Sequence, residues 1–258
     1  MGSASTLNLD EILNNIHNEK IIKDELGNDV ILKDNIDREE GMLLERLISV
    51  NGLSRSIEVG CAYGISSLYI CGAVTKHHGH HTIVDPFQTT DWNNIGITQL
   101  RNAGFENFTL LEERSEIALP KLVEQGAKFD FAFIDGWHTF DHTLLDMYYM
   151  NRLLCVGGIM VIDDVGMTGV EKAVNYFLNY PSYKFLDGIK VSEVTKERQF
   201  FMNFIISPLR IAAKLLPKKI SEEIFSDKVS GSGISGYSMV ALKKIKEDER
   251  PWNWYHNF

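Results

Sequence analysis

The feature that most constrains this chain is a regular alternation of short apolar segments with longer segments of helical period. Two of the apolar segments, 129–135 and 158–163, are nearly continuous runs, which is typical of strands buried on both faces of a sheet. Strands and helices that alternate in this way form right-handed βαβ units. We therefore predict an α/β fold with a doubly wound, mostly parallel sheet. The predicted strands are 55–60, 80–85, 107–112, 129–135, 158–163, 183–189 and 237–243, and the predicted helices are 9–18, 38–50, 66–76, 91–103, 115–125, 139–154 and 170–180.

Composition narrows the class of protein. The 258 residues carry 35 acidic and 26 basic side chains, a net charge of −9. A general nucleic-acid binder needs a basic face, so this balance argues against one. No apolar run approaches the roughly 18 residues of a membrane span, and a signal-peptide pattern is missing. The three cysteines have no CxxC spacing and predict neither disulfides nor a zinc knuckle. We expect a cytoplasmic protein.

A glycine-containing turn follows the first predicted strand and precedes a helix. It contains Gly60 and Gly64 with alanine at Ala62, which breaks the GxGxxG pattern of dinucleotide-binding dehydrogenases. Glycines here let the backbone approach a ligand beside the N-terminus of the helix. The next strand ends at Asp85, whose carboxylate can accept both hydrogen bonds of a ribose diol. Together they predict an adenosine-binding site, although a plain turn glycine and a strand-end aspartate are the simpler interpretation.

Three further aspartates follow two more predicted strands. Asp135 ends one of them, and Asp163 and Asp164 end the next. Parallel strands bring their carboxyl ends to one edge of the sheet, where these carboxylates would repel one another unless protonated or bound to a cation. An oxygen-only donor set favours Mg²⁺. The alternative is that Asp163 and Asp164 only cap the following helix.

On these residues the chain resembles the class I S-adenosylmethionine-dependent methyltransferases, and within them the metal-dependent catechol O-methyltransferase-like and macrocin-type O-methyltransferases. The resemblance runs from about residue 36 to 189 and implies a seven-stranded Rossmann-like sheet with N-terminal helices and an insertion between the last two strands. It implies Mg²⁺ or another divalent cation and S-adenosylmethionine as cofactors. The residues expected to bind S-adenosylmethionine are Glu58, Gly60, Gly64, Ser66, Asp85, Ser115 and Asp135, and the expected metal ligands are Asp135, Asp163 and Asp164.

The implied reaction transfers the sulfonium methyl group to a substrate hydroxyl. Asp135 and His138 are the expected catalytic residues, with His138 as the base or, alternatively, only a solvated histidine near the site. Trp137 is expected either to wall the acceptor pocket or to pack in the core. Gly136 and His138 depart from the histidine and the lysine that the catechol enzymes carry at these positions.

The resemblance divides the chain into four parts: an N-terminal helical segment (1–50), the S-adenosylmethionine-binding core (51–190), an insertion (191–236), and the last strand with an aromatic tail (237–258). The insertion is expected to be a substrate lid, and residues 200–220 leave open a weak contact with a membrane surface. The histidine cluster 77–81 is expected to be a loop away from the site. Trp252, Trp254 and Phe258 are expected to pack on the domain or on a second subunit, which leaves a homodimer open.

The leading hypothesis is therefore an O-methyltransferase for a small hydroxylated acceptor such as a sugar, a phenol or a natural-product intermediate. Two alternatives stay open from the sequence. One is an NAD-dependent oxidoreductase, which the broken glycine pattern disfavours. The other is a non-catalytic binding module with a membrane-facing insertion, which has no evident need for the three aspartates.

Overall fold

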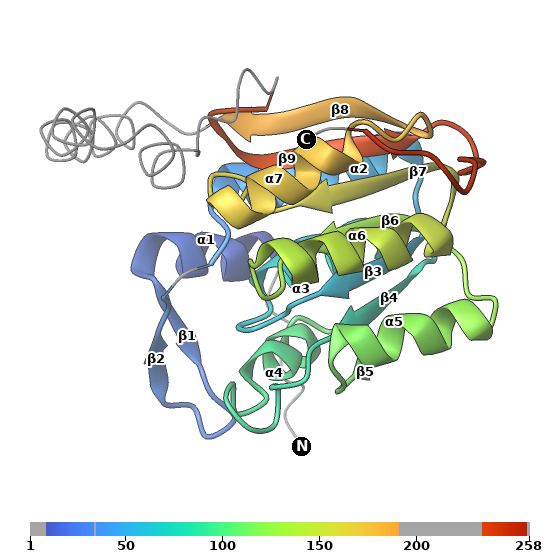
Figure 1. Ribbon diagram of the computed structural model, residues 1–258. Helices are drawn as coiled ribbons and strands as arrows, with labels where there is room; N and C mark the ends of the chain where they lie inside the picture. The colour runs from blue at the N-terminus through green and yellow to red at the C-terminus, as the bar shows by residue number, and fades with distance from the viewer. Residues whose placement is uncertain (1–8, 34, 191–233, 257–258) are drawn as a thin grey trace, which may run out of the picture.

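The computed structural model describes residues 9–33, 35–190 and 234–256. Seven strands form the main sheet, in the order β5-β4-β3-β6-β7-β9-β8, and β9 is antiparallel to both of its neighbours. Figure 1 shows the helices lying on both faces of this sheet. The predicted doubly wound, mostly parallel α/β fold with seven strands is confirmed.

The elements follow the predicted order, and their ends shift by a few residues. The strands are β3 (Arg55–Val59), β4 (His80–Val84), β5 (Phe108–Leu111), β6 (Phe129–Ile134), β7 (Leu154–Ile162), β8 (Tyr183–Lys190) and β9 (Tyr237–Lys244), and the helices are α1 (Leu9–Glu19), α2 (Arg38–Asn51), α3 (Ile65–Thr75), α4 (Ile95–Asn102), α5 (Ser115–Glu124), α6 (Phe140–Leu153) and α7 (Thr168–Phe177). β7 begins four residues earlier than expected, because Leu154 pairs with Phe129 across a register shift.

A two-stranded hairpin in the N-terminal region corrects the expectation that residues 1–50 are helical. Strands β1 (Ile21–Lys23) and β2 (Asp29–Ile31) pair antiparallel. The connecting turn is closed by Asp24, whose carboxylate accepts the backbone N–H of Leu26 and Asn28. Gly27 supplies a left-handed conformation with φ +82°.

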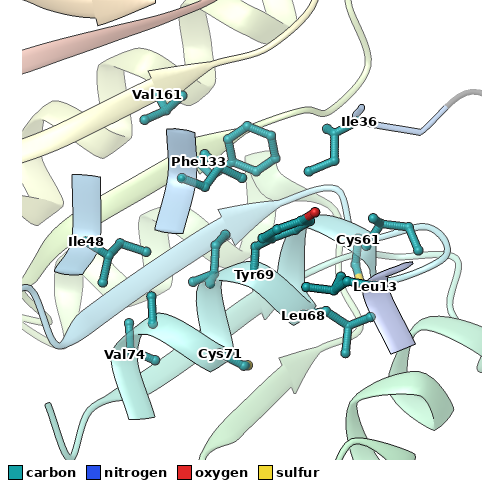
Figure 2. Packing of buried hydrophobic residues seen from close by; sticks show 14 of the residues in the cluster. Leu13, Ile36, Ile48, Cys61, Leu68, Tyr69, Cys71, Val74, Phe133 and Val161 are labelled. Atoms are coloured by element: carbon teal, nitrogen blue, oxygen red, sulfur yellow. The ribbon is translucent and has the colours of Figure 1, made fainter. Parts of the chain in front are cut away.

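Two apolar layers hold the sheet between the helices. Along β6, Phe131 and Phe133 point to the layer under α1, α2, α3 and α4, whereas Ala132 and Ile134 point to the layer under α5, α6 and α7. Figure 2 shows the first layer, where Phe133 lies beside residues of α3 such as Tyr69. Both faces of the central strands are thus buried, which is why their sequences are continuous apolar runs.

The expectations for the C-terminal part are tested only in places. Most of the insertion, 191–233, lies outside the described residues, as do the expected contact at 200–220 and Phe258. Trp254 packs on the domain, with its ring 5.4 Å from that of Tyr180. Trp252 is almost fully exposed. Within the described residues, no helix is long and apolar enough to cross a membrane.

Candidate active site

A cavity of about 890 Å³ opens at the carboxyl edge of β3, β4, β6 and β7. Four of the predicted site residues for the cofactor line it: Gly60, Asp85, Ser115 and Asp135. Asp163, Asp164 and His138 line it as well. This is the edge at which ligands bind in open α/β sheets.

Gly60 brings the turn after β3 into direct contact with the end of β6. Its φ is +87°, and a Cβ atom at this position would lie 1.9 Å from the carbonyl oxygen of Asp135. Gly64 is also left-handed, with φ +81°, and a Cβ there would lie 2.7 Å from the carbonyl oxygen of Gly96. Only glycine fits either position without displacing neighbouring backbone.

Asp85 is buried and binds the glycine turn directly. Its Oδ2 accepts hydrogen bonds from the backbone N–H of Cys61 (3.0 Å) and Ala62 (2.9 Å) and from the amide of Gln88 (2.9 Å). Its Oδ1 accepts the backbone N–H of Phe87 at 2.8 Å. A carboxylate oxygen has two acceptor sites, so among the described residues Oδ1 retains one for a ligand. The carboxylate fixes the shape of the turn, and its contact with a ribose stays a prediction.

Glu58 and Ser66 lie beneath the cavity and do not line it. The Glu58 carboxylate is fully buried and accepts hydrogen bonds from the hydroxyls of Ser66 and Ser67. His81 Nε2 lies 3.0 Å from Glu58 Oε2, and His81 Nδ1 lies 2.9 Å from the hydroxyl of Ser56. This network joins β3, β4 and the start of α3.

The histidine cluster 77–81 was expected to be a loop, and this expectation is wrong for its last two residues. His80 and His81 begin β4, and His81 is fully buried. The predicted cofactor contacts of Glu58, Gly64 and Ser66 stay predictions.

Asp135, His138 and Asp164 bring ligand atoms within 4.8 Å of one another. His138 Nδ1 lies 3.4 Å from Asp164 Oδ2, and His138 Nε2 lies 3.9 Å from Asp135 Oδ1. His138 and Asp164 both have positive φ, 56° and 53°, which is uncommon for residues with a Cβ. Asp163 is buried beside them, where one oxygen accepts the backbone N–H of Asp164. His138, and not the predicted Asp163, completes this compact group.

The electrostatics of the group fit a bound cation. Burial, followed by the charges of Asp164, Glu58 and Glu40, raises the pKa of Asp135 to about 8. Burial and the charge of Asp135 also raise the pKa of Asp163 well above its usual value. Carboxyl groups in this state need a proton or a positive ion at neutral pH, and a divalent cation reverses both shifts.

Glu40 is a site residue that the sequence analysis missed. It lines the cavity from α2, where its Oε2 accepts the backbone N–H of Asp37 in a capping box, and its Oε1 accepts the hydroxyl of Ser238 from β9. The Asp-x-x-Glu spacing is a helix-start signal. The spacing predicts that Glu40 caps the start of α2, but it does not predict the hydrogen bond between Glu40 and Ser238 of β9.

The wall near α5 and α6 contains Ser115 and Asp146, and Asp146 was not predicted. Aromatic side chains line the mouth: Trp137 is largely exposed, with its ring 6.3 Å from Phe87 and 6.4 Å from His142. Trp137 therefore lies at the cavity and not in the core, which leaves the acceptor-wall prediction as the remaining interpretation.

Comparisons with known proteins agree with this geometry. A family described as a methyltransferase domain matches residues 57–165. Catechol O-methyltransferase B of Danio rerio is 30% identical over 155 residues, which are 58% of this chain and 57% of the relative, so the chain spans a little over half the length of that curated protein.

Two solved structures share the fold at low sequence identity. The O-methyltransferase of Bacillus cereus, in complex with SAH, has a TM-score of 0.59 at 13% identity and covers 95% of this chain and 93% of its own. TomG of Streptomyces achromogenes, an O-methyltransferase involved in tomaymycin synthesis and in complex with SAM, has a TM-score of 0.56 at 16% identity and covers 95% and 99%. The sheet order and these likenesses show that the chain has the fold of the O-methyltransferases, and residues 57–165 are similar in sequence to a methyltransferase domain.

Proposed function

We propose that the protein is an S-adenosylmethionine-dependent O-methyltransferase that methylates a hydroxyl group of a small molecule with the help of Mg²⁺ or another divalent cation. The observation that carries the proposal is that one cavity contains the glycine turn, Asp85 and the Asp135–His138–Asp164 group. The glycine turn and Asp85 suit the cofactor. The Asp135–His138–Asp164 group, called the acidic group below, suits a cation that would hold the acceptor hydroxyl. The matched relative and the fold support the same activity.

The cofactor would lie across the ends of β3, β4 and β5. Gly60 allows the methionine part to pass close to the backbone, Asp85 offers its remaining acceptor to the ribose, and Ser115 lies where the adenine ring would end. Gly64, Glu58 and Ser66 support the turn from below. Asp135 belongs to the acidic group and would also contact the cofactor.

Two sets of residues would hold the cation. Both contain Asp135 and Asp164, and the third ligand is Asp163 in one set and His138 in the other. An all-oxygen set favours Mg²⁺, whereas a histidine nitrogen favours transition-metal ions such as Fe²⁺ or Zn²⁺. A bound divalent cation would make a coordinated hydroxyl more acidic.

The chain's own residues would orient the acceptor and take its proton. If Asp163 is the third ligand, the half-buried His138 is free to act as the base, and Asp164 on its Nδ1 orients the ring. Trp137 and Phe87 would cover the acceptor, and Glu40 with Ser238 would close the far side of the cavity. In-line placement of oxygen, methyl carbon and sulfur supplies much of the remaining rate.

Calorimetric titration with S-adenosylhomocysteine and with NAD tests the cofactor class. We expect S-adenosylhomocysteine to bind and NAD not to bind; binding of NAD alone would return the oxidoreductase alternative. A methyl-transfer assay over a panel of catechols, phenols and glycosides, with Mg²⁺ or with excess chelator, tests the reaction. Cofactor binding with no transfer to any acceptor would favour the non-catalytic binding module.

The remaining features of the proposal follow from the same site. The partner is a small hydroxylated acceptor and not nucleic acid, given the net charge of −9. The proposal also includes a cytoplasmic location, a homodimer and a division of the chain at residues 50, 190 and 236. The insertion (191–236) would act as a lid or meet a membrane surface, and its residues 191–233 lie outside the described residues. Size-exclusion chromatography with light scattering tests the dimer.

A further inference from the structure

A fully buried histidine–glutamate pair lies inside the apolar layer under α3. The side chains of His81 in β4 and Glu58 in β3 have no exposed surface, and His81 Nε2 lies 3.0 Å from Glu58 Oε2. Glu58 pairs with Ile83 of β4 in parallel register, and His81 precedes Ile83 by two residues, so all three face the same layer. Burying two ionisable groups costs free energy, and a well-packed apolar pair is often as stable. The pair is therefore more informative about function than about stability.

The pair belongs to a chain of hydrogen bonds that ends at the first turn of α3. The Glu58 carboxylate accepts the hydroxyls of Ser66 and Ser67, the second and third residues of that helix. His81 Nδ1 lies 2.9 Å from the hydroxyl of Ser56, so both ring nitrogens have a partner. An ionised carboxylate only accepts hydrogen bonds, so Nε2 of His81 carries the proton that it donates to Glu58.

These hydrogen bonds connect the two ends of the glycine turn. Glu58 lies two residues before Gly60, and Ser66 lies two residues after Gly64. Gly64 is the N-cap of α3 and has no side-chain hydrogen bond to offer, so the two serines attach the start of the helix to Glu58 instead. A helix start presents free backbone N–H groups to a ligand. A small shift of this turn would therefore change how the cofactor is bound.

We propose that His81 is a positioning residue for the cofactor: through Glu58, it holds the glycine turn and the start of α3 in the arrangement that binds S-adenosylmethionine. The inference rests on the proposed function. His81 does not line the cavity, so it acts through its neighbours. Asp85 holds the backbone N–H groups of Cys61 and Ala62 in the same turn. β4 and the residue after it thus supply two supports, and a binding site needs such supporting residues as well as those that touch the ligand.

Two amide variants of His81 form a matched pair for the test. A glutamine amide reaches the position of Nε2 and can donate to Glu58, whereas an asparagine amide ends near Nδ1 and reaches only Ser56. The measurement is calorimetric titration with S-adenosylhomocysteine, well below the melting temperature of each protein. We expect His81→Asn to weaken binding by about tenfold or more and His81→Gln to keep the affinity within about threefold of the unaltered protein.

Two further variants separate positioning from general stability. Lys244→Met removes a buried ammonium group of β9 that binds backbone carbonyls outside the cavity, and we expect it to lower the melting temperature and leave the affinity unchanged. If His81 acts through Glu58, the effects of His81→Asn and Glu58→Gln are not additive. We then expect the double variant to bind S-adenosylhomocysteine no more weakly than the weaker of the two single variants.

The outcomes distinguish this proposal from the proposed function. Failure of the unaltered protein to bind S-adenosylhomocysteine would overturn the proposed function itself. Equal affinities of folded His81→Asn and His81→Gln, or the same loss of affinity in Lys244→Met, would overturn the role of His81. Additive losses in the double variant would overturn the route through Glu58. If His81→Asn does not fold, Ser67→Ala tests the same route with a smaller change; we expect binding to weaken by about threefold, and an unchanged affinity would overturn the proposal.

Discussion

Replacing Gly60 by alanine perturbs a close backbone contact between the cofactor turn and Asp135 of the acidic group. The new Cβ would lie 1.9 Å from the carbonyl oxygen of Asp135 and 2.8 Å from its carbon, where real Cβ atoms keep at least 3.0 Å. The neighbour is backbone and not the end of a flexible side chain, so one strand end must move by about 1 Å. A left-handed residue with a Cβ costs about 1 kcal/mol, and overpacking typically adds about 1–3 kcal/mol.

Gly27 offers a matched control for this change. Its φ is +82°, close to the +87° of Gly60, but a Cβ there would meet nothing within 4 Å. We expect Gly27→Ala to lower the free energy of unfolding by about 1 kcal/mol and Gly60→Ala to lower it by about 2–4 kcal/mol. Urea denaturation followed by tryptophan fluorescence measures both values.

The same displacement should reach the chemistry. Asp135 would move with its carbonyl, and a misplacement of about 1 Å can reduce turnover by about 100-fold. We therefore expect Gly60→Ala to weaken binding of S-adenosylhomocysteine in calorimetry and to lower the methyl-transfer rate, whereas Gly27→Ala changes neither. Equal unfolding free energies for the two variants, with binding intact in both, would refute the reasoning.

Three further predictions concern single side chains of the site. We expect bound Mg²⁺ to raise the melting temperature. If Asp163 is the third ligand, Asp163→Asn should abolish this rise, and if His138 is the third ligand, His138→Gln should abolish it. Thermal unfolding with Mg²⁺ and with chelator distinguishes the two ligand sets. If His138 is the base, His138→Gln should lower kcat by about 100-fold or more while leaving the affinity for S-adenosylhomocysteine unchanged, as kinetics and calorimetry would report. Asp146 has a raised pKa of about 6, so its contribution to the stability of the ligand-free protein is present below about pH 4 and is lost as the pH rises through 6. Asp146→Asn should therefore gain stability over the unaltered protein by about 2 kcal/mol between pH 4 and pH 8, and an equal difference at both pH values in urea denaturation would contradict this.

The sheet was predictable because its signal is local. Each central strand is a short run in which successive side chains are buried on opposite faces, as in Phe131 and Ala132 of β6. The β1–β2 hairpin escaped prediction, because its strands have three residues each and one turn glycine, Gly27. A strand that short carries too little apolar pattern to stand out beside the helices that flank it.

The site was predictable to the extent that strand ends determine it. Parallel strands bring their carboxyl ends to one edge, so Asp85, Asp135 and Asp163 could be grouped from the sequence. Side-chain direction could not be read in the same way. Glu58 precedes the glycine turn by two residues, yet its carboxylate turns toward His81, because the pleat points it at the α3 face.

The buried carboxylates of the site differ in the groups that surround them, although most of them stand in similar positions at the ends of strands. The carboxylates of Glu58 and Asp85 are paired with donors of the chain itself, so they hold the turn and the strands in place. Asp135 and Asp163 face other acids, and the repulsion between them favours a cation. Asp146 accepts a hydrogen bond from Ser115, and its Oδ1 is buried without a donor from the described residues. The partner that each carboxylate lacks, and not its place in the sequence, therefore indicates which part of the reaction it serves.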